Sequence, residues 1–404
     1  MAIQDHRREK LTGGIVAATG RVAYHLVMAA GTVRTYQGPV ISETPTRDSS
    51  SVTRVRTHHA GIDLLRIVAA LLVFTAHVQG DIGVIGGPLG RELDGGRVGV
   101  VIFFALSGYL LYRPFVLGRV STARYVVTRL ARIYPAYLLA LVGVSLLSAD
   151  RTFIDHPVPY LLLAQNYVPE LSANPFLGVS WSLQLEMTFY FLLPAVALLV
   201  QRLSRGSVGL HLAWLGLIGV LSLVSALVLS PHLITFWQQF FPLVAWLFVP
   251  GMCLAVLEDR LPAWIGTRPV VVVGAVLVAA GAWFAPWINQ DVLTAAGSAT
   301  LVAWVLVRRP AMPDWVALGA ALSYAFYLWH VDVIRLVRSW GPWPVATIIA
   351  LVVTCAIAYG SYRLVERPVL TAAKGFRDRP RTHPPAHAVL APAPTPVPAP
   401  ESGR

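Results

Sequence analysis

The stretch over residues 62–80, IDLLRIVAALLVFTAHVQG, is apolar and long enough to cross a bilayer, yet it holds Asp63, Arg66 and His77. Arg66 and His77 are eleven positions apart, so on a helix they share one face about 16 Å apart along the axis. Asp63 precedes Arg66 by about one turn and is placed to pair with it. An imidazole at this depth can accept a proton from a hydroxyl, and a guanidinium can bind phosphate. The alternative is a helix-packing stripe with a structural histidine.

Two further titratable groups lie well inside apolar runs, Glu186 in WSLQLEMTFYFLLP and His330 in LSYAFYLWHVDVIRLV. Alternating span directions place both at the depth of His77, in the outer half of the membrane. Convergence of three such groups from three helices indicates a catalytic site, in which Glu186 or His330 orients His77 or the acceptor. The alternative is a buried structural pair in which Glu186 and His330 satisfy each other.

A second polar layer is predicted at the cytoplasmic face. Arg129 and Arg132 precede Tyr134, and Arg363 closes the last apolar run. Together with the charged pair that opens residues 62–80, they form a basic entrance suited to phosphates. The alternative role is topology anchoring and contact with anionic lipid. Between the two layers, Ser107 and the glycine after it allow a helix or an extended ligand to approach closely.

The composition shows which elements position these side chains. The chain has 404 residues, of which 56% are hydrophobic and 13% charged. Soluble domains carry about 25% charged residues, so the sequence predicts an all-α polytopic membrane bundle. The net charge of +12 lies in short segments between apolar runs, which argues against a nucleic-acid partner. Cys253 and Cys355 both lie inside apolar runs, so we expect neither a disulfide framework nor a metal site.

We expect about ten transmembrane helices. Their approximate ranges are 62–80, 98–117, 133–149, 181–200, 210–230, 236–257, 269–285, 291–307, 316–338 and 343–364. Arginine is concentrated in alternate connections, which predicts that both termini lie in the cytoplasm of a cell-membrane protein. These connections carry Arg113, Arg119, Arg124, Arg129, Arg132, Arg202, Arg205, Arg260, Arg268, Arg308 and Arg309.

The segments outside the spans are also distinct. Residues 1–58 are polar and basic, and we expect a flexible cytoplasmic tail. Residues 59–370 form the membrane domain, and residues 371–404 form a disordered Pro/Ala-rich cytoplasmic tail. In the long connection 150–180, the portion PYLLLAQNYV is too short to span and is expected in the membrane interface.

Six segments in this order resemble the signature segments of membrane-bound acyltransferase family 3: DLLRIVAALLVFTAH, GVVIFFALSGYLL, RLARIYPAYLL, WSLQLEMTFYFLLP, LSYAFYLWH and SYRLVERP. The resemblance implies an integral-membrane O-acyltransferase that moves an acyl group from cytoplasmic acyl-CoA to a carbohydrate, such as an exopolysaccharide, or to a small molecule such as a macrolide. It maps the family's basic residue and essential histidine onto Arg66 and His77. It also maps a further arginine onto Arg132 and the family's glutamate onto Glu186.

The sequence departs from the family pattern at Val101, Thr128 and Met187, where many members have charged residues. The departures concern substrate contacts more than the class of reaction. We expect acyl-CoA, with acetyl as its acyl group, as co-substrate and no bound cofactor. Its phosphates would lie near Arg66, Arg132 and Arg363.

The identity of the acceptor is open: an envelope carbohydrate, a glycolipid or a secreted small molecule. Direct transfer with His77 as general base and a covalent acyl-histidine intermediate also remain as alternatives. Ser107 and Tyr327 are candidate donors to the thioester oxyanion. A transporter or flippase of an envelope precursor is the rival function, because intramembrane His, Glu and Arg can also form a transport path. A structural or sensing protein that keeps the scaffold is a further alternative.

Overall fold

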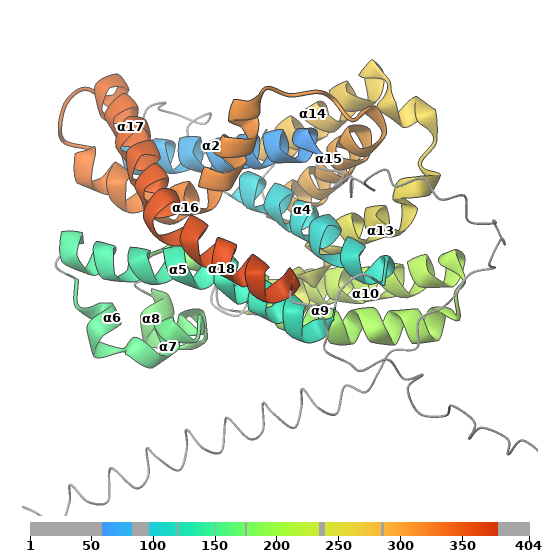
Figure 1. The fold of residues 1–404 in the computed structure, drawn as a ribbon. Coiled ribbons are helices and arrows are strands. Elements are labelled where there is room, and N and C mark those ends of the chain that lie inside the picture. The colour runs from blue at the N-terminus through green and yellow to red at the C-terminus, as the bar shows by residue number, and fades with distance from the viewer. Residues whose placement is uncertain are drawn as a thin grey trace, which may run out of the picture.

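The computed structural model describes residues 59–82, 97–118, 121–148, 150–173, 176–233, 239–283 and 287–378. The expected tail at 1–58 and most of the expected tail at 371–404 lie outside the described residues. All regular elements within the described part are helices (Figure 1). This confirms the all-α bundle.

Nine helical segments in the described part of the chain are long and apolar enough to cross a membrane. Seven of them are α2 (Ala60–Ile82), α4 (Arg97–Val116), α5 (Thr122–Ser148), α9 (Ser180–Ser204), α10 (Val208–Leu229), α15 (Trp287–Arg308) and α16 (Asp314–Val337). The other two are the segment Phe241–Arg260, which contains α13 (Val249–Leu257), and the segment Trp343–Ala373, which begins with α17 (Trp343–Ser361). The shorter apolar helix α14 (Arg268–Trp283) corresponds to the expected span 269–285. The prediction of about ten spans is therefore confirmed.

Helix α5 begins at Thr122, eleven residues before the expected start at 133. Residues 122–132, TARYVVTRLAR, contain no proline or glycine, so the helix continues through the charged region that a hydropathy criterion excludes. Arg129 and Arg132 consequently project from a helix rather than from a loop.

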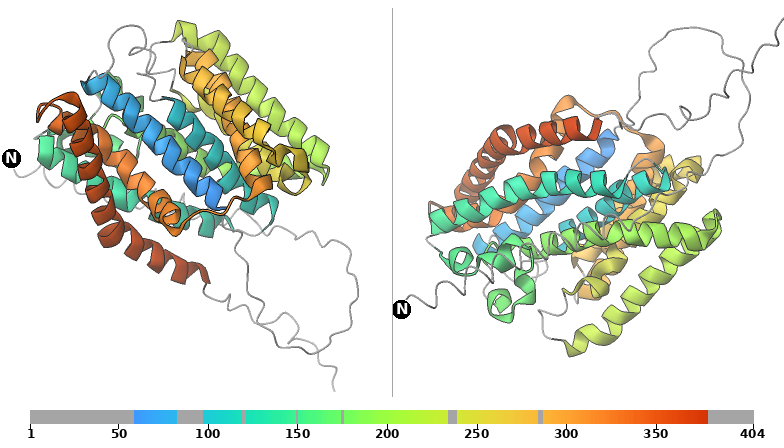
Figure 2. Two further views of the ribbon diagram at one scale, coloured as in Figure 1. Left: turned by 90° about the horizontal axis from the view of Figure 1, so that it is seen from above. Right: turned by 60° about the horizontal axis from the view of Figure 1, so that its bottom comes forward.

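Helix α2 lies between α4 and α16 (Figure 2). Helix α4 also packs against α13, where Gly108 faces the backbone carbonyl of Phe248 and Gly251 faces that of Ala105. A Cβ at either glycine would overlap the opposite backbone, so these residues allow the two helices to touch directly. The close approach expected beside Ser107 is therefore made by a helix.

Helix α17 passes through a π-helical turn at Tyr362–Glu366 into α18 (Arg367–Asp378), which packs against α5. The helix continues eight residues beyond the boundary expected at 370. Residues 371–378, TAAKGFRD, lack proline and so do not end the helix. The C-terminal tail therefore starts later than expected, and residues 379–404 lie outside the described part.

The connection after α5 folds back along that helix as α6 (Thr152–Asp155), α7 (Pro157–Leu161), the 3-10 turn η1 (Gln165–Tyr167) and α8 (Pro169–Ala173) (Figure 1). The Tyr134 hydroxyl donates to the Leu161 carbonyl at 3.0 Å, and the Tyr137 hydroxyl donates to the Tyr160 carbonyl at 2.9 Å. The connection thus lies against the middle of α5 rather than beyond its end.

Candidate active site

Two histidines from different helices meet inside the bundle. His77 of α2 and His330 of α16 have ring centroids 4.9 Å apart at an interplanar angle of 77°. Their closest polar atoms, His330 Nε2 and His77 Nδ1, are 3.3 Å apart. His330 is 1% exposed, whereas His77 is only partly buried. Of the pair, His77 is the more exposed ring.

Backbone carbonyls fix the tautomers of both rings in their neutral form. His77 Nδ1–H donates to the Val73 carbonyl at 2.8 Å, and His330 Nδ1–H donates to the Tyr327 carbonyl at 2.7 Å. Each Nε2 then carries a lone pair, because a neutral imidazole has one proton. His330 Nε2 is therefore a second acceptor for His77 Nδ1–H, and His77 Nε2 is its basic atom.

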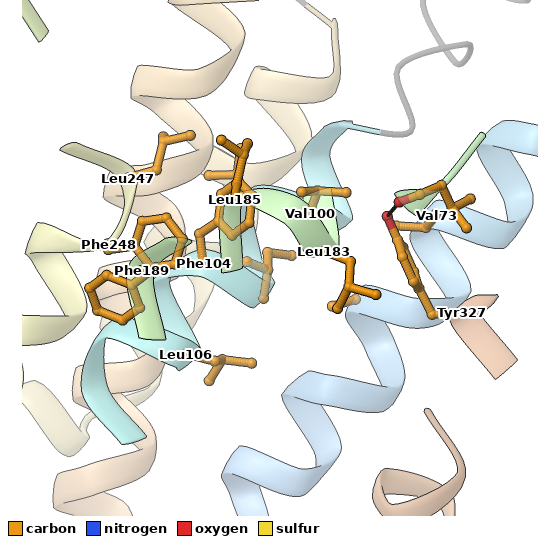
Figure 3. Packing of buried hydrophobic residues seen from close by; sticks show 14 of the residues in the cluster. Val73, Val100, Phe104, Leu106, Leu183, Leu185, Phe189, Leu247, Phe248 and Tyr327 are labelled. Carbon is orange, nitrogen blue, oxygen red and sulfur yellow. Dashed lines mark hydrogen bonds between the residues drawn. The ribbon is translucent and has the colours of Figure 1, made fainter. Parts of the chain in front are cut away.

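Aromatic and hydroxyl side chains hold His330 in place. The Phe326 ring stacks on the His330 ring with centroids 6.2 Å apart and planes 3° apart. The Tyr327 hydroxyl is 2.6 Å from Ser182 Oγ and donates to the Val179 carbonyl at 3.1 Å. Tyr327 thus ties the start of α9 to the histidine pair, and it lies beside Val73 of α2 in Figure 3.

Glu186 lies apart from the two histidines. Its Oε1 accepts hydrogen bonds from Ser107 Oγ at 2.8 Å and from the Tyr190 hydroxyl at 2.6 Å. Among the described residues it has no hydrogen bond to His77 or His330. Glu186 is four residues, about 6 Å, further along α9 than Ser182, which places it below the histidine layer. The structural pairing of Glu186 with His330 is therefore not formed, and the Ser107 proton is already donated to Glu186.

Arg66 lies about 16 Å from His77 along α2, in a second polar layer that also contains Glu186. We call this second layer the inner layer. Arg66 is partly buried and within electrostatic range of Glu186, Arg132 and Asp63. In the described part of the chain, no hydrogen bond or ion pair within 4.0 Å reaches its guanidinium, so the expected close pair with Asp63 is absent. Arg66 therefore retains N–H donors for an anion.

Arg132 and Arg129 border this layer from α5. Arg132 contacts the buried carboxylate of Glu366 at 3.4 Å and lies over the Tyr324 ring. Arg129 lies over the Tyr125 ring, and its buried Nε has no hydrogen-bond partner within the described part. Glu366 follows the last apolar run, three residues after Arg363, and its side chain is fully buried beside Arg132.

Two residues that were predicted to bind acyl-CoA, Arg363 and Tyr134, lie away from Arg66. Arg363 is exposed and stacks on Tyr359, with its guanidinium carbon 5.9 Å from the ring centroid. Tyr134 faces the folded-back connection through its bond to Leu161. The structure brings neither residue to Arg66.

An ionic cluster that was not predicted joins the start of α2 to the ends of α4 and α13. Glu258 contacts Arg113 at 2.6 Å and His59 at 3.4 Å, and it accepts a hydrogen bond from Tyr109 at 2.9 Å. Arg113 also contacts Asp259 at 2.7 Å. These contacts bring the first residues of α2 next to the last residues of α4 and α13. This arrangement agrees with the expectation that α2 runs in the opposite direction to α4 and α13.

A histidine pair above an arginine-bearing layer, both inside a bundle of apolar helices, defines a multi-pass membrane enzyme. The chain belongs to acyltransferase family 3: the family's acyltransferase domain matches residues 59–363. It is an acyltransferase.

Several curated proteins are similar to the chain over most of its length. Nodulation protein 10 of Rhizobium leguminosarum bv. viciae is 25% identical over 78% of this chain and 94% of the relative. The exopolysaccharide production protein ExoZ of Rhizobium meliloti (strain 1021) is 27% identical over 71% of this chain and 94% of the relative. A candidate O-acetyltransferase of Staphylococcus aureus (strain COL) is 27% identical over 76% of this chain and 56% of the relative. No solved structure is detectably similar to the chain.

Proposed function

We propose that this protein is an O-acyltransferase that moves an acyl group, acetyl in the simplest case, from cytoplasmic acyl-CoA to a hydroxyl of an envelope carbohydrate, a glycolipid or a secreted small molecule. The observation that carries the proposal is the tautomer of His77. Nδ1 is held by the Val73 carbonyl and faces His330, so Nε2 is the atom that accepts a proton.

The inner layer supports an acyl-CoA donor. Arg66 has unused donors, and the contact between Arg132 and Glu366 is 3.4 Å, longer than a tight charge-assisted bond of about 2.8 Å. A phosphate can therefore take N–H groups from both arginines, with Arg129 beside them. Asp63 limits the net positive charge of this layer.

The reaction follows from these positions. The acceptor O–H gives its proton to His77 Nε2 while its oxygen attacks the thioester carbonyl carbon. The C–S bond then breaks, and the departing CoA thiolate takes the proton from the imidazolium. His330 positions His77 by accepting from its Nδ1–H. In the inner layer, Glu186 accepts hydrogen bonds from Ser107 and Tyr190.

The names of the relatives favour a carbohydrate acceptor, because one is an exopolysaccharide production protein and another a candidate O-acetyltransferase. The arginine distribution supports cytoplasmic termini. Acyl-CoA then enters at the basic end of the bundle and the acceptor at the other end, with lipids around the helices.

Release of free CoA by the purified protein in lipid nanodiscs tests the proposal. Acetyl-CoA with a hydroxyl acceptor should yield CoA, and His77→Ala should reduce the rate by roughly 10²–10⁴-fold, as expected when a general base is lost. His211→Ala is the matched control, because His211 bonds Tyr112 at 2.7 Å outside this site and should keep the activity.

An added acyl mass should also appear on glycans or metabolites of cells that carry the protein, and should be missing in cells with His77→Ala. A His77→Ala variant that transfers acetyl at the wild-type rate would remove His77 as the base. Failure of the wild type to release CoA with any acceptor, together with unchanged glycans and metabolites, would refute the transfer reaction.

A further inference from the structure

The connection that folds back along α5 buries two polar side chains, those of Gln165 and Asn166. Tyr134, whose hydroxyl bonds the Leu161 carbonyl, lies fourteen residues before the end of α5, roughly 21 Å along the axis. Directly after α7, Leu163 has a φ of 52°, and the chain forms a single 3-10 turn at Gln165–Tyr167. Irregular backbone at membrane depth occurs where it is enclosed by protein or lines a cavity.

Two amide side chains in this turn have unused polar atoms. Gln165 is 1% exposed and Asn166 is 7% exposed. Gln165 Nε2 donates to Ser180 Oγ at 2.7 Å, and the Asn166 backbone N–H donates to Gln184 Oε1 at 3.1 Å. Gln165 Oε1 and Asn166 Nδ2 have no hydrogen-bond partner in the described part of the chain. Turning the Gln165 amide over would only exchange which of its atoms lacks a partner.

An acceptor and a donor that are buried without partners in two consecutive residues destabilise the fold unless a ligand pairs with them. Gln165 Oε1 accepts an O–H, and Asn166 Nδ2–H donates to a hydroxyl or ether oxygen. Neither group carries charge, which disfavours a phosphate. We propose that Gln165 and Asn166 form a binding subsite for the hydroxyls of a saccharide acceptor.

This subsite lies on the opposite side of α9 from the histidine pair. Ser180, which bonds Gln165, and Ser182, which bonds Tyr327, are two residues apart and therefore about 200° apart around the helix. The two amides and the histidine pair are therefore separated by the diameter of a helix with its side chains, about 10 Å. The amides thus hold a sugar unit remote from the hydroxyl that receives the acyl group. That the ligand is the acceptor rests on the proposed function; the binding site itself does not.

Saturation-transfer NMR on the protein in lipid nanodiscs measures the binding directly. The probes are the methyl glycosides of glucose, galactose, mannose, rhamnose and N-acetylglucosamine. At least one should receive saturation from the wild type. In the double variant Gln165→Met/Asn166→Leu its affinity should fall by at least about tenfold, as expected from two lost hydrogen bonds.

Thermal unfolding separates binding from a structural role. Asn166→Leu removes a side chain whose Nδ2 is unpaired, so the melting temperature of this single variant should be unchanged or higher while its affinity for the glycoside falls. Gln165→Met also removes the bond from Nε2 to Ser180 Oγ, so the double variant should melt at a lower temperature than Asn166→Leu. Gln201→Met is the matched control, since Gln201 Nε2 donates to the Phe115 carbonyl at 2.9 Å. Gln201→Met should lower the melting temperature and keep the binding.

Absence of saturation transfer to every glycoside in the wild type would overturn the subsite, as would unchanged binding in the double variant. Wild-type binding that is lost in the double variant supports the subsite even if no acetyl is transferred, in which case the proposed function alone fails. Acetyl transfer to a glycoside at the same acceptor KM in wild type and double variant would remove the subsite and keep the proposed function.

Discussion

His330 should assist His77 to a small and calculable degree. His77 Nδ1–H has two acceptors, the Val73 carbonyl at 2.8 Å and His330 Nε2 at 3.3 Å. Loss of His330 leaves the shorter bond, which still fixes the tautomer. The lost bond contributes about 0.5–1.5 kcal/mol, so kcat should fall by roughly twofold to tenfold. Loss of His77 itself should cost far more, roughly 10²–10⁴-fold.

Two substitutions separate positioning from packing. His330→Gln keeps an acceptor oxygen near the position of Nε2, whereas His330→Asn keeps only a donor near Nδ1 for the Tyr327 carbonyl. The CoA-release assay should show kcat restored to within about threefold in the Gln variant and lowered by up to about tenfold in the Asn variant, with the KM for acetyl-CoA equal in both. A loss as large as that of His77→Ala, or equal losses in the two variants, would refute the assignment of His330 as a positioning residue.

Two further outcomes follow from the charged side chains. Arg132→Ala should raise the KM for acetyl-CoA by roughly 10- to 150-fold, since a hydrogen bond to a charged group contributes about 1.5–3 kcal/mol. Arg363→Ala, at an exposed residue, should leave this KM unchanged, and equal effects of the two substitutions would contradict the geometry. The Arg97 guanidinium contacts the buried Asp291 carboxylate at 2.7 Å. Asp291→Ala should therefore destabilise the fold by about 3–5 kcal/mol. It should lower the melting temperature more than the double substitution Arg97→Leu/Asp291→Leu does. A double variant no more stable than Asp291→Ala would count against this pair.

Hydropathy located the helices because a membrane span must satisfy its backbone internally and therefore reads as a long apolar run. The same criterion misplaced the start of α5, since charged residues extend a helix beyond the apolar core without breaking it. Glu366 shows a related limit: it follows the last apolar run, and its burial against Arg132 depends on the π-helical turn, which apolarity does not predict.

The site was predictable where one helix determines it. Arg66 and His77 both lie on α2, so their spacing alone places them on one face. The meeting of His77 with His330 also agrees with the depths inferred from span directions. Glu186 was predicted at the depth of the two histidines, but it lies further along α9. Hydropathy does not reveal a relative shift of two helices by one turn, which is about 5 Å. The direction of Arg363 depended in the same way on helix rotation.

The two layers of the site are joined by one rigid element. Between Arg66 and His77 the sequence IVAALLVFTA contains no glycine or proline, and the structure shows an unbroken helix. Their separation is therefore fixed at about 16 Å, and a donor bound at Arg66 reaches His77 only through an extended arm. A single inserted residue would rotate His77 by about 100° relative to Arg66 and remove it from His330. The proposed reaction thus depends on the length of this helical segment as much as on the identity of its two polar residues.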